Sequence, residues 1–94
     1  MRKYELVCVI QPDLDEAAFT GLLERVQGWV SESGGSVDKV DIWGKRKLAY
    51  LIRKYREGNY VLFNLSLQPG SIGGLEQNLR YTEPVIRHML TLVA

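Results

Sequence analysis

Two kinds of hydrophobic periodicity follow one another along these 94 residues in an order that few folds accommodate. Four stretches alternate apolar and polar residues with a period of two, typical of β-strands, and two repeat apolar residues at three- and four-residue spacing, typical of helices. The predicted strands span residues 3–11, 37–52, 60–68 and 85–93. The predicted helices run from a cap at Asp13 or Asp15 to Ser33, and from Ser71 to Leu79.

This order, β-α-β-β-α-β, is that of a ferredoxin-like sandwich, an α+β fold. In such a fold two helices cover one face of a four-stranded antiparallel sheet and leave the other face open. The length suits a single domain over residues 1–94. One face of the first predicted strand carries Tyr4, Leu6, Cys8 and Ile10, and we expect that face to lie against the helices.

The cysteine and histidine content argues against a disulfide or a metal site. The sequence has one cysteine, Cys8, and one histidine, His88, which excludes an internal disulfide and a zinc cluster. Both lie on the apolar parity of their strands. We therefore expect a buried core thiol and a histidine packed at the rim of the sheet, and we predict no cofactor.

No motif for catalysis is found in the sequence. A phosphate loop, a nucleophile elbow and a dinucleotide fingerprint are all missing. Small phosphatases of this topology bind an anion in the loop after the first strand, but here that loop carries Asp13 and Asp15, which would repel phosphate. We therefore expect a protein that is not an enzyme.

Residues 43–50, Trp-Gly-Lys-Arg-Lys-Leu-Ala-Tyr, combine two aromatics, a glycine and three consecutive cations. We expect them to form the middle of a long edge strand, with Leu48 and Tyr50 in the core and a bulge near Gly44 that redirects the cations. Solvated strand ends explain any single cation equally well, and edge strands also use lysine to prevent unwanted pairing. Three cations together between aromatics favour contacts with nucleic-acid phosphates.

A net charge of only +1 is low for a protein that binds nucleic acid alone. Either the cations act locally or a second protein shares the contact. The open face offers a surface for a protein partner because some of its residues are apolar, namely Val7, Val9, Leu62 and Met89. Base stacking across that face is disfavoured, since the first strand presents Glu5 and Val7 where RNA-recognition modules of this topology carry aromatics.

Five segments match a known family in order along essentially the whole chain. They are Tyr4-Glu5, Pro12 before the long helix, the run 43–52, Gly58-Asn59-Tyr60, and the run Glu-Pro-Val-Ile-Arg-His-Met at 83–89. Together they resemble the bacterial small-subunit ribosomal protein S-six family. The run 43–52 is the most specific of the five, and the others support it.

The resemblance implies a structural component of the small ribosomal subunit, in the platform of its central domain, on the cytoplasmic ribosome. It implies a ferredoxin-like fold, no catalysis, and joint binding of small-subunit ribosomal RNA with ribosomal protein S-eighteen, which would supply much of the positive surface. The RNA contacts that it implies are Arg2, Lys45, Arg46, Lys47, Arg80 and Arg87. Many family members continue into a charged tail, whereas this sequence ends at Ala94. Either the sheet and its edges hold the partner alone, or such a tail lies outside this sequence.

The alternative is a small-molecule-binding or oxygenase-like homodimer of the same fold. It would use a cavity between the sheet and the helices, near His88 and Cys8. The sequence shows no convergent set of polar residues on the core parity to line such a cavity. A ligand bound there, or a stable homodimer through the open face, would favour this alternative.

Overall fold

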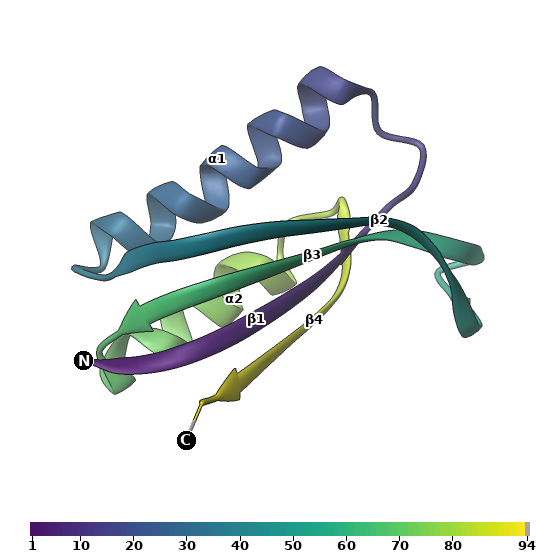
Figure 1. Ribbon diagram of the computed structural model, residues 1–94. Helices are drawn as coiled ribbons and strands as arrows, with labels where there is room; N and C mark the ends of the chain where they lie inside the picture. Colours follow the sequence, from purple (N-terminus) through teal and green to yellow (C-terminus); the bar gives the residue numbers. More distant parts are fainter. Residues whose placement is uncertain (94) are drawn as a thin grey trace.

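The computed structural model describes residues 1–93 and contains the predicted elements in the predicted order (Figure 1). The sheet consists of β1 (Arg2–Ile10), β2 (Ser36–Ile52), β3 (Tyr55–Leu67) and β4 (Val85–Leu92). The helices are α1 (Glu16–Glu32) and α2 (Ile72–Arg80), and a 3₁₀ turn (Pro69–Ser71) precedes α2. The strand order is β2-β3-β1-β4, and each neighbouring pair is antiparallel. The predicted ferredoxin-like α+β fold is confirmed.

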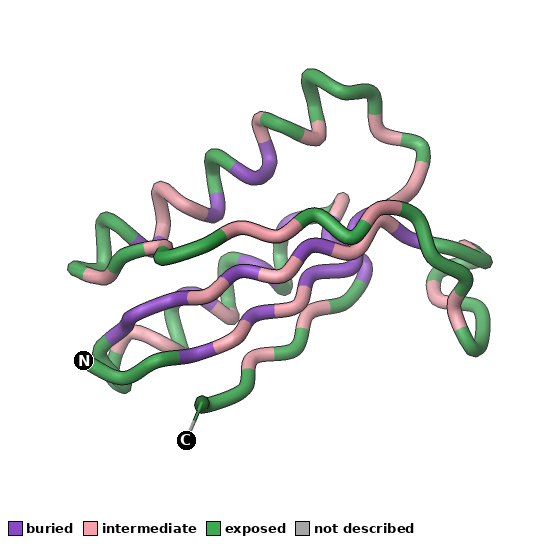
Figure 2. The backbone as a smooth tube through the Cα atoms, in the orientation of Figure 1, coloured by how far each residue is buried: buried purple, intermediate pink, exposed green. Residues whose placement is uncertain are grey.

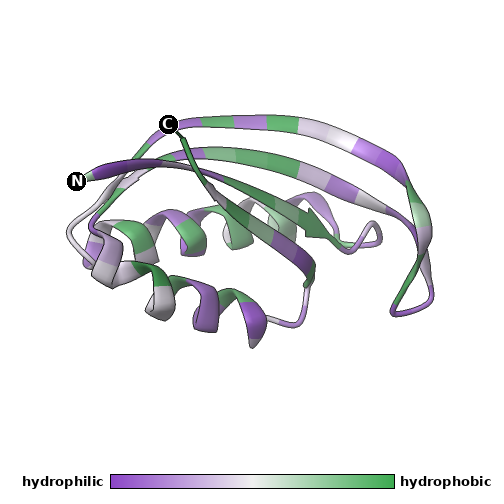
Figure 3. Cartoon of the chain, turned by 90° about the horizontal axis from the view of Figure 1, so that it is seen from below, coloured by the Kyte–Doolittle hydropathy of each residue, from purple (hydrophilic) through white to green (hydrophobic). Residues whose placement is uncertain are grey.

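Both helices lie on the same side of the sheet (Figure 3), and the core fills the space between. The two central strands alternate as predicted, and the residues that face the helices are 6% exposed or less: Tyr4, Leu6, Cys8, Ile10, Val61, Phe63, Leu65 and Leu67. The helices contribute Leu22, Leu23, Val26, Val30, Leu75 and Leu79. Figure 2 shows this burial concentrated along the central strands and the inner sides of the helices. We call the uncovered side of the sheet the open face.

Local contacts define both ends of α1. The carboxylate of Asp15 accepts a hydrogen bond from the backbone N–H of Ala18 at 2.7 Å, so Asp15 is the N-cap and Asp13 is not. Gly34 follows the helix with φ of +86°, a conformation that glycine adopts without strain. At Gly35 a Cβ atom would lie 2.5 Å from the carbonyl oxygen of Ser66, so the chain passes too close to β3 for any side chain.

The pairing of the long edge strand β2 with β3 shifts register three times, and the predicted bulge near Gly44 is confirmed. The first shift lies between Val37 and Lys39, the second between Ile42 and Gly44, and the third between Lys47 and Ile52. Gly44 itself has φ of +82°. Because an extra residue reverses the alternation of all that follow, the second bulge moves Arg46 from the helix side to the side of the open face and both lysines to the opposite side.

The hairpin between β2 and β3 is longer than the sequence predicted. We expected a polar connection over 53–59, but β3 begins at Tyr55 and only the turn at Arg53 and Lys54 lies outside the strands. Both turn residues have positive φ, 48° and 71°, as a tight hairpin turn requires. This segment is polar because it belongs to a two-stranded ribbon that no helix covers. Without a side buried against a helix, its sequence shows no hydrophobic alternation.

The prediction that Leu48 and Tyr50 lie in the core is wrong. Tyr50 is 61% exposed, and Leu48 is half-buried outside the core cluster. The pairing explains this result: Asn59 pairs with Lys45 on one side and with Ile10, the last residue of β1, on the other. Beyond that point none of the described strands lies beside the hairpin as a third strand. We call residues 46–58 the outer hairpin, and Figure 1 shows it extending past the sheet and bending.

Candidate nucleic-acid interface

The three consecutive cations begin where the sheet narrows to a two-stranded ribbon. Lys45, Arg46 and Lys47 are all exposed, and they pair with Asn59, Gly58 and Glu57 respectively. Alternation along the strand places Arg46 on the side of the open face and both lysines on the opposite side. The cations therefore present positive charge on both sides of the ribbon, which suits contacts with a phosphate backbone.

Arg46 takes part in a stack of side chains on the open face. Trp43, the extra residue of the second bulge, stacks on Tyr60 of β3 with ring centroids 6.3 Å apart and planes 12° apart. The Arg46 guanidinium carbon lies 5.7 Å from the centre of the Trp43 ring, within the range of a cation–π contact. The bulge thus directs Arg46 away from the core, as the sequence predicted.

Arg87 of β4 adds a further cation near the same end of the open face. Its guanidinium donates a hydrogen bond to the hydroxyl of Tyr50 and lies 6.0 Å from that ring. Arg53 in the hairpin turn donates to the carbonyl oxygen of Glu83, at 2.9 Å, in the loop before β4. These two contacts tie the outer hairpin to the start of β4. Arg53 was not among the predicted site residues, because the sequence of a turn does not show which distant group an arginine side chain contacts.

The other two predicted cations lie apart from this group. Arg80 is the exposed last residue of α2, and the loop that follows leads to the start of β4, so it lies toward the hairpin end on the helix side. Arg2 begins β1, whose opposite end adjoins the hairpin, so it lies at the far end of the sheet. The structure therefore brings Lys45, Arg46, Lys47 and Arg87 to one end and leaves Arg2 at the other.

The predicted partner-protein residues form one continuous surface on the open face. Val7 pairs with Leu62 on one side and with Met89 on the other, and Val9 follows Val7 on β1. Met89 is 53% exposed, whereas Val9 is only 4% exposed because the outer hairpin covers it. A hollow of about 190 Å³ lies here, lined by Val7, Val9, Leu48, Ala49, Tyr50, Ile52, Tyr60, Arg87, His88 and Met89.

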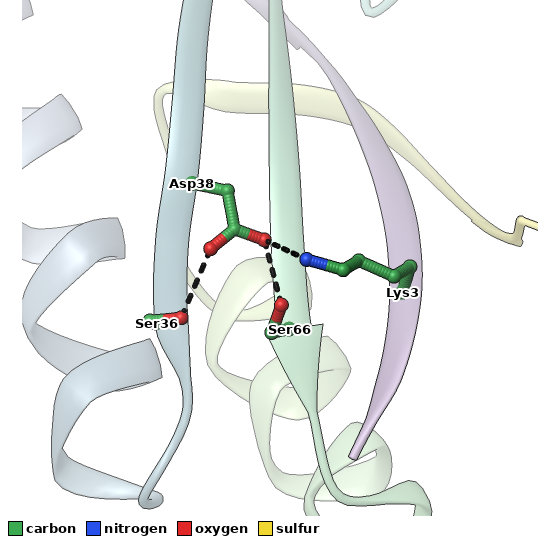
Figure 4. Close-up of polar contacts among 4 residues, drawn as sticks. All are labelled: Lys3, Ser36, Asp38 and Ser66. Atoms are coloured by element: carbon green, nitrogen blue, oxygen red, sulfur yellow. Dashed lines mark hydrogen bonds and ion pairs between the residues drawn. The ribbon is translucent and has the colours of Figure 1, made fainter.

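A polar cluster occupies the opposite end of the open face (Figure 4). The first bulge of β2 directs Asp38 toward β3, where it accepts a hydrogen bond from the Ser66 hydroxyl at 2.6 Å. Lys3 of β1 lies 3.3 Å from the same carboxylate, and the Ser36 hydroxyl donates to it at 3.1 Å. The Ser66 hydrogen bond, followed by those of Lys3 and Ser36, lowers the pKa of Asp38. This cluster links three strands, and its lysine is paired with a carboxylate.

Cys8 and His88 show no feature of a reactive site. Cys8 is buried in the core, as predicted, and burial raises the pKa of its thiol to about 12, so it stays protonated at neutral pH. His88 is half-buried and pairs with Cys8 from the edge strand. The hollow that His88 lines lies on the open face, not between the sheet and the helices as the small-molecule alternative requires. Within residues 1–93, His, Cys, Asp and Glu form no group able to hold a metal.

None of the described helices is long and apolar enough to cross a membrane.

Comparison with known proteins gives a consistent result over almost the whole chain. Residues 3–91 match the family described as Ribosomal protein S6. The chain is 46% identical over 90 residues to the small ribosomal subunit protein bS6 of Clostridium botulinum (strain Loch Maree / Type A3), covering 96% of each. It is 42% identical over 93 residues to the bS6 protein of Dictyoglomus turgidum, covering 99% of this chain and 96% of the relative.

A solved structure agrees with the sequence relatives. The crystal structure of 30S ribosomal protein S6 from Thermotoga maritima superposes with a TM-score of 0.92 at 33% sequence identity, covering 98% of this chain and 87% of that one. The family consists of structural proteins rather than enzymes, and its members are parts of the ribosome in the cytoplasm. This chain therefore belongs to the ribosomal protein S6 family of the small ribosomal subunit.

Proposed function

We propose that this protein binds small-subunit ribosomal RNA in the central domain, at the platform, jointly with ribosomal protein S-eighteen. The observation that carries the proposal is that a cationic end, formed by Lys45, Arg46, Lys47 and Arg87, adjoins the apolar part of the open face. One surface suits phosphate and the other suits a protein. Their adjacency lets RNA and partner meet on the same side of the molecule.

The RNA contacts are made mainly to phosphates. The three cations at 45–47 are exposed, lie on both sides of a narrow ribbon and have no carboxylate within salt-bridge distance among the described residues. Such contacts position a protein on RNA without reading sequence and weaken steeply with salt. Arg80 and Arg2 add contacts at more distant points.

The partner protein docks on Val7, Val9, Leu62 and Met89. A net charge of +1 leaves little electrostatic attraction for RNA in the isolated chain, so a second protein has to contribute positive surface. The apolar residues are contiguous across three strands and partly hollowed, which suits the insertion of an apolar side chain.

Joint binding is tested by mixing the chain, S-eighteen and a central-domain ribosomal RNA fragment, and measuring complex formation by gel shift. We expect the two proteins together to bind far more tightly than either alone. Met89→Asp should weaken the complex, because it places a charge in the apolar surface. Thr20→Asp is the matched control, since Thr20 is exposed on α1, on the helix side and away from the predicted contacts. Absence of RNA binding with both proteins present would overturn the proposal.

A further inference from the structure

We propose that Trp43, together with Arg46 and Tyr60, is a stacking site for an unpaired base of the bound RNA. The inference rests on the proposed RNA binding and adds a second kind of contact to it. The phosphate contacts described above involve charge alone. The stack would hold a nucleobase through its π-face, which every base has, so it would tolerate different sequences.

The position of Trp43 makes such a site available. Trp43 sits at a bulge on the edge strand, is 41% exposed, and keeps one aromatic neighbour, Tyr60, nearly parallel to it. Gly44 lies directly opposite Tyr60, and a Cβ atom placed at Gly44 would meet nothing within 4 Å. The backbone beside the aromatic pair is therefore open, which leaves room for a planar group to approach.

Arg46 supplies the chemistry that distinguishes a base site from an apolar patch. A guanidinium over an indole occupies the place that a base takes in RNA complexes, where bases stack on aromatic rings and on arginine planes. When a base enters, Arg46 either covers it from the other side or turns to the adjacent phosphate. Lys45 and Lys47 are the sequence neighbours of Arg46 and, from the opposite side of the narrow ribbon, hold phosphates farther along the same RNA strand.

This location differs from the one that the sequence disfavoured. Glu5 and Val7 on β1 exclude stacking across the centre of the open face, but the aromatic pair lies at the edge, on β2 and β3. The sequence showed Trp43 and Tyr60 separately. Their contact depends on the bulge register, which places Gly44 rather than Trp43 opposite Tyr60.

The protein contains its own matched control. Trp29 on α1 also has an arginine over its ring, with the Arg25 guanidinium carbon 5.3 Å from the ring centre. Trp29 belongs to a groove on the helix side that also contains Glu32, whose charge would repel phosphate. These are the only two tryptophans in the sequence, so replacing either by phenylalanine leaves the other as the single tryptophan, which is excited selectively at wavelengths that the five tyrosines do not absorb.

The test is a fluorescence titration of Trp29→Phe and Trp43→Phe at low salt. The probes are a single-stranded oligoadenylate of about ten nucleotides and inorganic polyphosphate of matched charge, which has no bases. We expect oligoadenylate to quench Trp43 and to leave Trp29 nearly unchanged. Polyphosphate should bind without quenching Trp43. Trp43→Leu keeps an apolar side chain but removes the ring, so it should weaken oligoadenylate binding about 5- to 100-fold and leave polyphosphate binding unchanged.

Three results would overturn the stacking site. The first is that oligoadenylate quenches the fluorescence of Trp43 and Trp29 equally. The second is that Trp43→Leu weakens the binding of oligoadenylate and of polyphosphate equally. The third is that S-eighteen alone changes the fluorescence of Trp43 and that RNA, added afterwards, changes it no further. Joint binding of central-domain RNA by Trp43→Leu with wild-type affinity would overturn the stack and leave the proposed function standing. Absence of joint binding by the wild-type protein would overturn both.

Discussion

Arg87 on β4 donates a hydrogen bond to the hydroxyl of Tyr50 on β2, so the two edge strands of the sheet contact each other. The contact exists because β2 continues beyond the end of β1 and its outer part bends back toward β4. It covers Val9 and helps to form the hollow on the open face. It also fixes the direction of a cation that we assign to RNA binding.

Tyr50→Phe removes this hydrogen bond and retains the ring. We expect the free energy of unfolding to fall by about 1 kcal/mol, because the bond is solvent-accessible and Arg87 can donate to water instead. Urea denaturation monitored by circular dichroism measures the change. Tyr81→Phe is the control, since Tyr81 is largely exposed at the end of α2. If the free energy of unfolding falls equally in both variants, the hydrogen bond of the Tyr50 hydroxyl does not stabilise the position of the outer hairpin.

The sequence predicts the fold well in strands that have one face covered by the helices and one face open to solvent. Tyr4, Leu6 and Phe63 alternate with polar residues because one face of the sheet is covered and the other is not. The same logic fails in the outer hairpin. Neither side of that ribbon is covered by a helix, so the apolar Tyr50 is exposed and the start of β3 at Tyr55 carries no hydrophobic signal.

The sequence predicted which cations belong to the candidate site but not how they are arranged in space. Three consecutive basic residues are visible in any sequence, and the glycine beside them indicated a bulge. The tie between Arg53 and Glu83 and the stack of Trp43 on Tyr60 join residues 30 and 17 positions apart. Such contacts depend on the exact pairing of β2 with β3, which the periodicity of one strand does not specify.

Two glycine-to-alanine substitutions should change stability in opposite directions. Gly28 lies within α1, and a Cβ atom there would meet nothing within 4 Å, so Gly28→Ala should stabilise the protein by about 0.5–1 kcal/mol. At Gly35 the Cβ atom would lie 2.5 Å from a backbone oxygen, so Gly35→Ala should destabilise it by about 1–3 kcal/mol. Urea midpoints at unchanged m-value measure both effects. A stabilising Gly35→Ala would contradict the close approach to β3.

The Asp38 cluster predicts a pH-dependent contribution to stability. The pKa of Asp38 is lowered in the folded protein, so its charged form stabilises the fold at pH values above the pKa of an unfolded aspartate, about 3.9. This contribution is lost as the pH falls through the folded-state pKa. Wild type should therefore be more stable than Asp38→Asn at neutral pH, and the difference should shrink in acid.

The partners of Asp38 should each account for part of this pH dependence. The Ser66 hydrogen bond is the largest single cause of the lowered pKa, and Lys3 adds a hydrogen bond and a charge, so Ser66→Ala and Lys3→Met should both reduce the pH dependence. Urea denaturation across an acid-to-neutral pH series measures both variants against wild type. An unchanged pH dependence in Ser66→Ala would contradict the part assigned to the hydroxyl.

The 45–47 cations are proposed to contact phosphates of ribosomal RNA. The most direct test of this contact is the salt dependence of joint binding, with S-eighteen, to a central-domain RNA fragment. Replacing Lys45, Arg46 and Lys47 by alanine should make the slope of log K against log salt less steep by up to about three phosphate contacts, about 0.7–0.9 for each. Arg25→Ala removes a cation from the helix side and should leave the slope unchanged. A triple variant with the wild-type slope would show that these cations do not contact RNA phosphates.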